Sequence, residues 1–296
     1  MSDARLRTAR RRIRLLVLDV DGTVMDSRHD VTAAARRAVR RVRDAGVRVM
    51  LATGRRYRDT LPVARALDID EPIVTASGAL VKRPTDHLTI DRARFAPGVL
   101  DRLLAAIVAA GHEPVVYTDS FAAGYDFHCR VAAAGNGGLG EYLDRNRELA
   151  RVSPDLDVAP PEGVFAGFTM GALPAMLALE AALHASLPAQ LSLHVIRSPR
   201  YRDWLCEFAP ADVTKWSGVR GRAGAWGIAA DEICAVGDDV NDLPMIRAAG
   251  LGVAMGNAVA EVRAAADRVV AGHEADGLDE VAELVLAETS QSAAPG

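Results

Sequence analysis

The chain has 296 residues, of which 50% are hydrophobic and 5% aromatic, so its core must consist mainly of aliphatic side chains. The net charge of −4 includes no block of like charges in the body of the chain, which argues against nucleic acid or an anionic membrane as a partner. No apolar run is long enough to cross a membrane, and the scattered cysteines form no C-x-x-C pair, which is typical of reduced thiols in the cytoplasm. The basic residues 1–12 lack the apolar stretch of a signal peptide and predict a flexible arm.

Apolar strands and an amphipathic helix alternate in the first part of the sequence. Residues 13–20 predict a continuous buried strand. Residues 31–46 place apolar side chains at three- and four-residue steps and predict a helix that ends at Gly46. Residues 47–54 and 72–78 predict two further buried strands. Strands that alternate with helices are typical of a parallel sheet covered on both faces.

The pattern changes after Gly78, where hairpins and longer polar segments replace the alternation. The stretch 131–165 is rich in Gly, Ala and Pro and predicts no clear element. We interpret residues 82–209 as an inserted α+β domain. Its predicted elements are a hairpin at 79–91, helices at 97–111 and 175–187, and strands at 113–119, 191–198 and 203–210.

Alternation resumes near Ala211. A helix at residues 215–226 precedes a short strand at 233–237, and further strand and helix pairs continue to about residue 289. The predicted fold class is therefore α/β, with a Rossmann-like parallel sheet core and an inserted α+β cap domain. The core is discontinuous, over residues 13–81 and 210–289, the cap covers 82–209, and residues 290–296 form a disordered tail.

Acidic and small polar side chains lie at the ends of the predicted core strands. They occur in DVDGT from Asp19, ATGR from Ala52 and GDDVND from Gly237, and Lys215 begins the helix between the last two segments. Because ligands bind outside the carboxyl ends of strands in an open parallel sheet, these segments should meet in one crevice. A plain turn with solvated acids is the alternative interpretation of Asp-Gly at residues 21–22.

Three converging carboxylates, from Asp19, Asp21 and Asp238, would repel one another without a cation. Oxygen ligands alone, with no histidine or cysteine in these segments, favour Mg²⁺ over zinc or calcium. Asp19 could then attack phosphorus, while Asp21 protonates the leaving oxygen and offers its backbone carbonyl to the metal.

Thr53 and Gly54 offer a hydroxyl and a backbone N–H to the phosphoryl oxygens, and Lys215 supplies a compact positive charge. The chain has 35 basic residues, and only Lys82 and Lys215 are lysine. The choice of lysine at position 215 favours a tight pocket, where an ammonium fits better than a guanidinium.

The ordered segments DVDGT, LATGR, Lys215, GDDVNDLPM, AGLGVAMGNA and EADG resemble the motifs of the haloacid dehalogenase-like hydrolases. The pattern is most similar to the Cof-type phosphatases, which carry a large α/β cap between the second and third motifs. This resemblance implies an Mg²⁺-dependent phosphatase whose cap is the insertion at residues 82–209. The same resemblance implies that Asp19 is the nucleophile and Asp21 the acid/base. It implies that Thr53, Gly54 and Lys215 bind the phosphate. It also implies that Asp238 is a metal ligand, with Asn241 and Asp242 as its neighbours in the metal and phosphate shell.

The chain departs from the family pattern at two places. It has Ser77-Gly78-Ala79 where family members have Asn-Gly-Ala in a loop that faces the substrate, so Ser77 and Gly78 are possible substrate contacts. It also has Trp216 where a glycine follows the motif lysine, which places an indole near the pocket mouth or against the core.

Other polar residues are interpreted conservatively. Asp26 lies past the turn, and Asp239 is secondary to Asp238. Arg55 and Arg197 could touch substrate, but in so arginine-rich a chain a solvated face is favoured for both. The histidines, including His128 and His194, are expected to be surface or satisfied core residues, and AMGNA is expected to be architectural.

The leading functional hypothesis is an Mg²⁺-dependent phosphatase that hydrolyses a small phosphorylated metabolite, such as a sugar phosphate, through an aspartyl-phosphate. A cap that closes over the crevice excludes bulky polymers and favours small substrates. The alternatives are a phosphomutase with the same intermediate and a non-catalytic metabolite-binding protein. The sequence predicts no oligomeric state.

Overall fold

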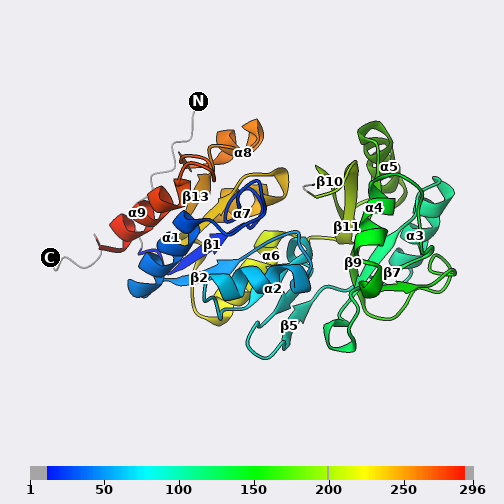
Figure 1. Cartoon of the computed structure of the whole chain (residues 1–296), viewed down its shortest axis with the longest axis horizontal. Coiled ribbons are helices and arrows are strands. Elements are labelled where there is room, and N and C mark those ends of the chain that lie inside the picture. Colours follow the sequence, from blue (N-terminus) through cyan, green and yellow to red (C-terminus); the bar gives the residue numbers. More distant parts are fainter. Residues whose placement is uncertain (1–11, 199, 291–296) are drawn as a thin grey trace.

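The structure, a computed structural model, describes residues 12–198 and 200–290 and shows two lobes joined side by side (Figure 1). One lobe, here called the core, contains a parallel sheet, and the other, the cap, contains a mostly antiparallel sheet. The predicted fold class is confirmed. The predicted arm and tail lie outside the described residues, apart from the last residue of the arm and the first of the tail.

The core sheet has the strand order β14-β13-β12-β1-β2, and every pairing in it is parallel. The first strand, β1, lies in the middle because its four aliphatic side chains can be buried on both faces. It pairs with β2 on one side and with β12 on the other. The strands are β1 (Leu15–Leu18), β2 (Arg48–Leu51), β12 (Ile233–Gly237), β13 (Leu251–Ala254) and β14 (Arg268–Val269).

Helices cover both faces of this sheet, because successive side chains of β1 point to opposite sides. Leu16 and Leu18 belong to one hydrophobic cluster, and Leu15 and Val17 belong to another. The helices on the first side are α1 (Ala33–Asp44), α2 (Tyr57–Ala66) and α9 (Gly277–Ser290), and those on the second are α6 (Lys215–Ala225) and α7 (Leu243–Ala248). A further helix, α8 (Ala260–Ala265), packs beside α7.

A small antiparallel sheet continues the core next to β2. It consists of β3 (Ile73–Thr75), β4 (Leu80–Lys82) and β5 (Thr89–Arg92), and the predicted hairpin at residues 79–91 is thereby confirmed. A single parallel bridge between Ala52 and Val74 joins this sheet to the end of β2.

The cap sheet has the order β10-β11-β9-β6-β7-β8, and only the β7–β8 pairing is parallel. Helices α3 and α5 pack on one face, and α4 packs on the other. The predicted limits of core and cap stay a prediction, although each lobe has its own sheet. The cap elements are α3 (Val99–Ala109), β6 (Val115–Thr118), β7 (Phe127–Cys129), α4 (Gly138–Arg145), β8 (Ala150–Val152), β9 (Val164–Gly171), α5 (Leu173–Ser186), β10 (Leu191–Arg197) and β11 (Trp204–Pro210).

None of the helices in the described ranges combines the length and the apolar character needed to span a bilayer. The cytoplasmic location stays a prediction.

Candidate active site

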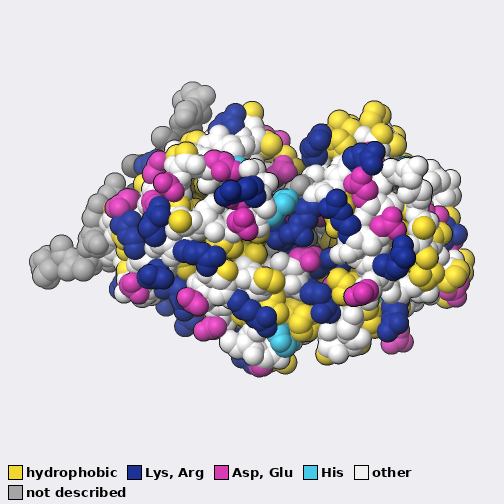
Figure 2. Space-filling model, viewed as in Figure 1, with side chains coloured by type: hydrophobic (Ala, Val, Ile, Leu, Met, Phe, Trp, Pro, Cys, Tyr) yellow, Lys and Arg dark blue, Asp and Glu magenta, His cyan; other side chains and the backbone are white. Residues whose placement is uncertain are grey.

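A cleft of about 450 Å³ lies between the carboxyl ends of the core strands and the cap sheet. Lys and Arg side chains gather in the hollow between the two lobes (Figure 2). Successive residues of β11 alternate between this cleft and the cap interior: Leu205 and Glu207 line the cleft, whereas Cys206 and Phe208 pack in the cluster beneath α3 and α5. The predicted residues that line the cleft are Asp19, Asp21, Thr53, Gly54, Lys215, Asp238 and Asn241.

Lys215 links two carboxylates at the floor of the cleft. Thr214 caps α6 and forms a capping box with Ser217, so Lys215 is the first residue of the helix, at the edge of the sheet. Its ammonium donates to Asp19 Oδ1 at 2.8 Å and to Asp242 Oδ1 at 2.7 Å. Burial lowers the pKa of Lys215, but the charges of the two aspartates outweigh burial and raise it overall. The lysine therefore stays charged.

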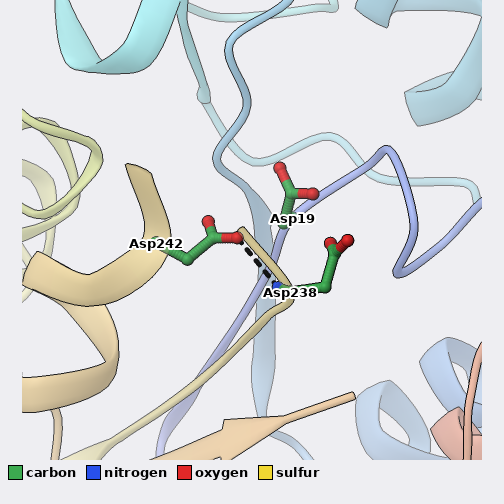
Figure 3. Close-up of side chains that lie close together, drawn as sticks. All are labelled: Asp19, Asp238 and Asp242. Carbon is green, nitrogen blue, oxygen red and sulfur yellow. Dashed lines mark hydrogen bonds between the residues drawn. The ribbon is translucent and has the colours of Figure 1, made fainter. Parts of the chain in front are cut away.

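Three carboxylates form a compact group that could hold a cation. Asp19 follows β1, Asp238 follows β12, and Asp242 ends a short 3-10 helix (Figure 3). One oxygen from each lies within 4.8 Å of the others. Asp242 is fully buried, and its Oδ2 accepts from the backbone N–H of Asp238 at 2.9 Å and of Asp239 at 3.1 Å. Asp242 therefore fixes the loop that presents Asp238.

The DG turn that follows Asp19 is shaped around Asp238. Gly22 has a φ of +72°, and a Cβ added there would lie 2.2 Å from Asp238 Oδ2. Thr23 donates its hydroxyl to Asp238 Oδ1 at 3.2 Å, and Asn257 donates to the carbonyl of Gly22 at 2.9 Å. The predicted turn at Asp21-Gly22 is therefore present, and only glycine fits at position 22 because Asp238 lies so close. Asn257 of the AMGNA segment holds this turn and also lines the cleft.

The electrostatics of the group suit a divalent cation. Burial raises the pKa of Asp19 to about 7 although Lys215 lowers it, and burial together with the charges of Asp19 and Asp242 raises the pKa of Asp238 to about 9. A bound cation would keep both ionised. The buried Asn241 Oδ1 has no hydrogen-bond partner and adds a free oxygen beside the carboxylates. Such an oxygen-only set fits Mg²⁺.

Arg55 pairs with Asp21, which the sequence interpretation did not foresee. Its Nε and Nη2 donate to the two carboxylate oxygens at 2.6 and 2.5 Å. The arginine side chain is 8% exposed, so the expected solvated position is wrong. Burial raises the pKa of Asp21, but the hydrogen bonds and charge of Arg55 lower it below its ordinary value overall. The two consecutive arginines at 55–56 directly follow Thr53-Gly54, the predicted phosphate-binding segment, and this position could have indicated that Arg55 lies in the site.

Thr53 and Gly54 lie at the end of β2 and line the cleft. The backbone N–H of Thr53 donates to the Val74 carbonyl at 2.9 Å, so within this pair the backbone N–H of Gly54 is the one that could donate to a ligand oxygen. The Thr53 hydroxyl accepts from the backbone N–H of Arg55 at 3.2 Å and keeps its own proton to donate.

Ser77 and Gly78 lie behind the cleft wall. The Ser77 hydroxyl donates to Glu207 Oε2 at 3.0 Å, and burial raises the pKa of Glu207 to about 7 although Ser77 and Lys215 lower it. A Cβ on Gly78 would lie 2.0 Å from the carbonyl oxygen of Thr214, so Gly78 permits the close approach of α6. The substrate role of Ser77 and Gly78 stays a prediction. Trp216 packs against the core cluster beneath α6.

The other polar residues take varied positions. Asp26 accepts from the backbone N–H groups of Arg28 and Asp30 in an exposed turn outside the cleft. Asp239 lines the cleft and caps the 3-10 helix that follows it. His128 and His194 lie outside the cleft lining, whereas Arg197 is exposed at its rim.

Together these groups could support phosphoryl chemistry. A buried carboxylate next to a fixed ammonium can act as a nucleophile, and a second carboxylate two residues away can carry a proton. Oxygen ligands for a hard cation and hydrogen-bond donors for an anion surround the same point.

The sequence is similar to a known protein family and to individual proteins of named function. The model of the haloacid dehalogenase-like hydrolases matches residues 16–281. The chain is 28% identical over 280 residues to the 5-amino-6-(5-phospho-D-ribitylamino)uracil phosphatase YitU of Bacillus subtilis, with 89% of this chain and 94% of that protein covered. It is 26% identical to the phosphoglycolate phosphatase of Pyrobaculum neutrophilum, with 92% and 96% covered.

The fold is also similar to solved structures. A haloacid dehalogenase-like hydrolase from Bacteroides thetaiotaomicron matches with a TM-score of 0.76 at 23% identity, and 93% of this chain and 100% of that chain are covered. The similarity in fold therefore includes both the core and the cap of this chain.

Proposed function

Because this chain belongs to the haloacid dehalogenase-like hydrolase family, we propose that it hydrolyses a small phosphomonoester through an aspartyl-phosphate on Asp19, with Mg²⁺ as cofactor. The predicted family is confirmed, and the predicted phosphatase class agrees with the names of its relatives. The observation that carries the mechanism is the buried bond between Lys215 and Asp19 Oδ1, which fixes one carboxylate oxygen and leaves the other for attack.

In the first step, the free oxygen of Asp19 attacks phosphorus and the bond from phosphorus to the leaving oxygen breaks. Asp21 donates its proton to the leaving oxygen, so the alcohol departs neutral. In the second step, Asp21 takes a proton from water, the water oxygen attacks phosphorus, and the bond to Asp19 breaks to release phosphate. Each step leaves the residues ready for the next.

Asp21 must carry a proton in the first step, yet Arg55 holds it ionised. We propose that Arg55 turns toward the phosphoryl group when substrate binds. The pKa of Asp21 then rises, because its main counter-charge has moved away.

Asp19, Asp238 and the backbone carbonyl of Asp21 would hold Mg²⁺, and Asn241 and Asp242 would support it. The ion would neutralise charge on the phosphoryl oxygens. Thr53, Gly54 and Lys215 would bind the same oxygens with their hydroxyl, backbone N–H and ammonium.

The cleft volume of about 450 Å³ supports a metabolite-sized substrate such as a sugar phosphate. The names of the relatives from B. subtilis and P. neutrophilum describe them as phosphatases of small phosphate esters, which supports the same class here.

The test is phosphate release from a panel of small phosphate esters with Mg²⁺, using wild type and Asp19→Asn. We expect release from at least one ester by wild type, and a loss of about 10⁴-fold or more in Asp19→Asn. Activity that survives Asp19→Asn would contradict the aspartyl-phosphate. Product analysis distinguishes hydrolysis from transfer of the phosphoryl group back to the substrate, because a phosphomutase would yield an isomer in place of free phosphate.

A further inference from the structure

Three guanidinium groups that the proposed hydrolysis does not use line the cleft. Arg56 precedes α2 of the core, Arg197 is the last residue of β10 in the cap, and Arg200 follows that strand. Arg55 and Lys215, by contrast, are already paired with the catalytic carboxylates. Figure 2 shows the resulting concentration of basic side chains between the lobes.

Arg56 is a buried guanidinium with an unused donor. Its side chain is 8% exposed, its Nε donates to Asp59 at 2.8 Å, and its Nη2 donates to Asn146 at 2.7 Å. Nη1 has no hydrogen-bond partner, and an oxygen of Asp126 lies 3.8 Å away. Because a buried N–H without an acceptor is costly, a ligand oxygen that reached Nη1 would be bound favourably.

The side chains of Arg197 and Arg200 have neither an ion pair nor a hydrogen bond within the described part of the chain. Arg200 lines the same cleft as Asp19 and Asp21. A group bound by Arg200 would therefore share the cleft with the phosphoryl group.

Carboxylates balance one of these three guanidinium groups. Arg56 is paired with Asp59 at 2.8 Å and lies 3.8 Å from Asp126, whereas the side chains of Arg197 and Arg200 have no carboxylate partner among the described residues. Glu207, which also lines the cleft, accepts from Ser77. The remaining positive charge favours an anion over a neutral polyol.

We propose, on the basis of the phosphatase function above, that the leaving group of the substrate carries a second anionic group. Arg197 and Arg200 bind this group, which is a carboxylate or a phosphate. Arginine suits this role because its planar fork binds either anion through two hydrogen bonds. The substrate is then a phosphorylated acid or a bisphosphate, and a simple sugar monophosphate is a poorer substrate.

The experiment uses substrate pairs that differ only in the second charge. 6-Phosphogluconate and glucitol 6-phosphate share one carbon chain and differ in a carboxylate against a CH₂OH group. Fructose 1,6-bisphosphate and fructose 6-phosphate test a second phosphate. We expect kcat/KM to be about tenfold or more higher for the anionic member of at least one pair, and the favoured pair identifies the group.

The variants are Arg197→Gln and Arg200→Gln, with Arg40→Gln on the exposed face of α1 as the matched control for charge. The cleft variants should lose about tenfold in kcat/KM on the anionic member and less than about threefold on the neutral one. Activity on the neutral member shows that each variant is folded. Arg56 is left intact because its other nitrogens hold Asp59 and Asn146.

Two results would overturn the inference, and they have different consequences for the proposed phosphatase function. If wild type hydrolyses both members of each pair equally, or the cleft variants lose activity equally on both, the second anion is wrong and the phosphatase function stands. If wild type hydrolyses no ester at all, the proposed function fails as well.

Discussion

At the scale of single residues, the two lysines of the chain offer a direct comparison. Lys215 lies between Asp19 and Asp242, and Lys82 donates to Asp119 at 2.6 Å outside the cleft. Both ammonium groups are buried. Each lysine should therefore matter for stability, and one of them for chemistry.

We predict that Lys215→Met destabilises the protein by about 3–5 kcal/mol, because it leaves buried carboxylates unpaired. Lys82→Met should cost a similar amount for the same reason. Only Lys215→Met should abolish phosphate release, since Lys82 does not line the cleft. Urea unfolding and a phosphate assay at a temperature where both variants are folded test this. Normal turnover in Lys215→Met would contradict the proposed role.

The raised pKa values of Asp19 and Asp238 predict a particular dependence of stability on pH. A carboxyl whose pKa is higher in the folded than in the unfolded state destabilises the fold as pH rises from about 4 toward its folded pKa, here about 7 for Asp19 and about 9 for Asp238. With EDTA, Tm should therefore fall between pH 5.5 and pH 8.5. Mg²⁺ should raise Tm more at pH 8.5 than at pH 5.5.

Asp238→Asn is the control for this pH effect, because it removes one of the carboxyls with a raised pKa and leaves Asp19 and Glu207 in place. Its Tm should fall less with pH than that of wild type, and Mg²⁺ should stabilise it less. A wild-type Tm that rises steadily over this range in EDTA would show that the carboxylates are not the controlling groups.

Motif residues could be predicted from the sequence, and their partners could not. Asp19, Lys215 and Asp238 were placed in one site because each follows or begins a core element in a fixed order. Arg55 and Glu207 were missed for different reasons. In an arginine-rich chain one more arginine carries little information, and Glu207 reaches the cleft through strand pairing within the cap.

At the scale of elements, the position of α6 depends on a glycine outside that helix. Gly78 has a φ of +107°, and an added Cβ would overlap the carbonyl of Thr214, the cap of α6. We predict that Gly78→Ala costs roughly 3 kcal/mol or more of stability and displaces Lys215. Gly46→Ala is the matched control, because Gly46 has a φ of +79° in open space and only the conformational cost of about 1–2 kcal/mol applies. Equal losses of stability in the two variants would contradict the steric argument.

The core elements could be predicted because their patterns are simple. Four consecutive buried aliphatic residues mark β1, and α1 has a clear apolar face. In the cap, β9 was missed because nearly all of its residues are buried, so it lacks alternation, and because it contains Gly167 and Gly171. Helix α4 was also missed, because it contains two glycines, which are unfavourable in helices. Its Gly138 packs against the backbone of Arg202. Such close packing depends on distant residues that local patterns do not reveal.

At the scale of the whole molecule, polar contacts hold the cap against the core. Arg58 of α2 donates from Nε to both oxygens of Asp126 at 3.0 Å and from Nη2 to the carbonyl of Phe121 at 3.1 Å. Both acceptors belong to the cap. The position of the cap on the core therefore depends partly on a side chain that does not line the main cleft.

We predict that Arg58→Gln weakens the contact between cap and core by about 1 kcal/mol, because a partly exposed ion pair with extra hydrogen bonds is lost. This corresponds to a rise in KM of about fivefold, with kcat changed less. Arg83→Gln, which removes an exposed ion pair with Asp86, should leave both constants unchanged. A fall in kcat at constant KM would place Arg58 in the chemistry itself.

The central position of β1 has a consequence for biosynthesis. Its register joins Leu15 to Arg48, which the ribosome makes soon afterwards, and to Ile233, which follows roughly 220 residues later. At translation rates of about 5–20 residues per second, one edge of β1 stays unpaired for on the order of 10–40 s. The cap, whose strands pair within residues 115–210, can fold in that interval. The nascent chain thus exposes an aliphatic strand edge while it waits, and chaperone binding or aggregation at this edge competes with completion of the sheet.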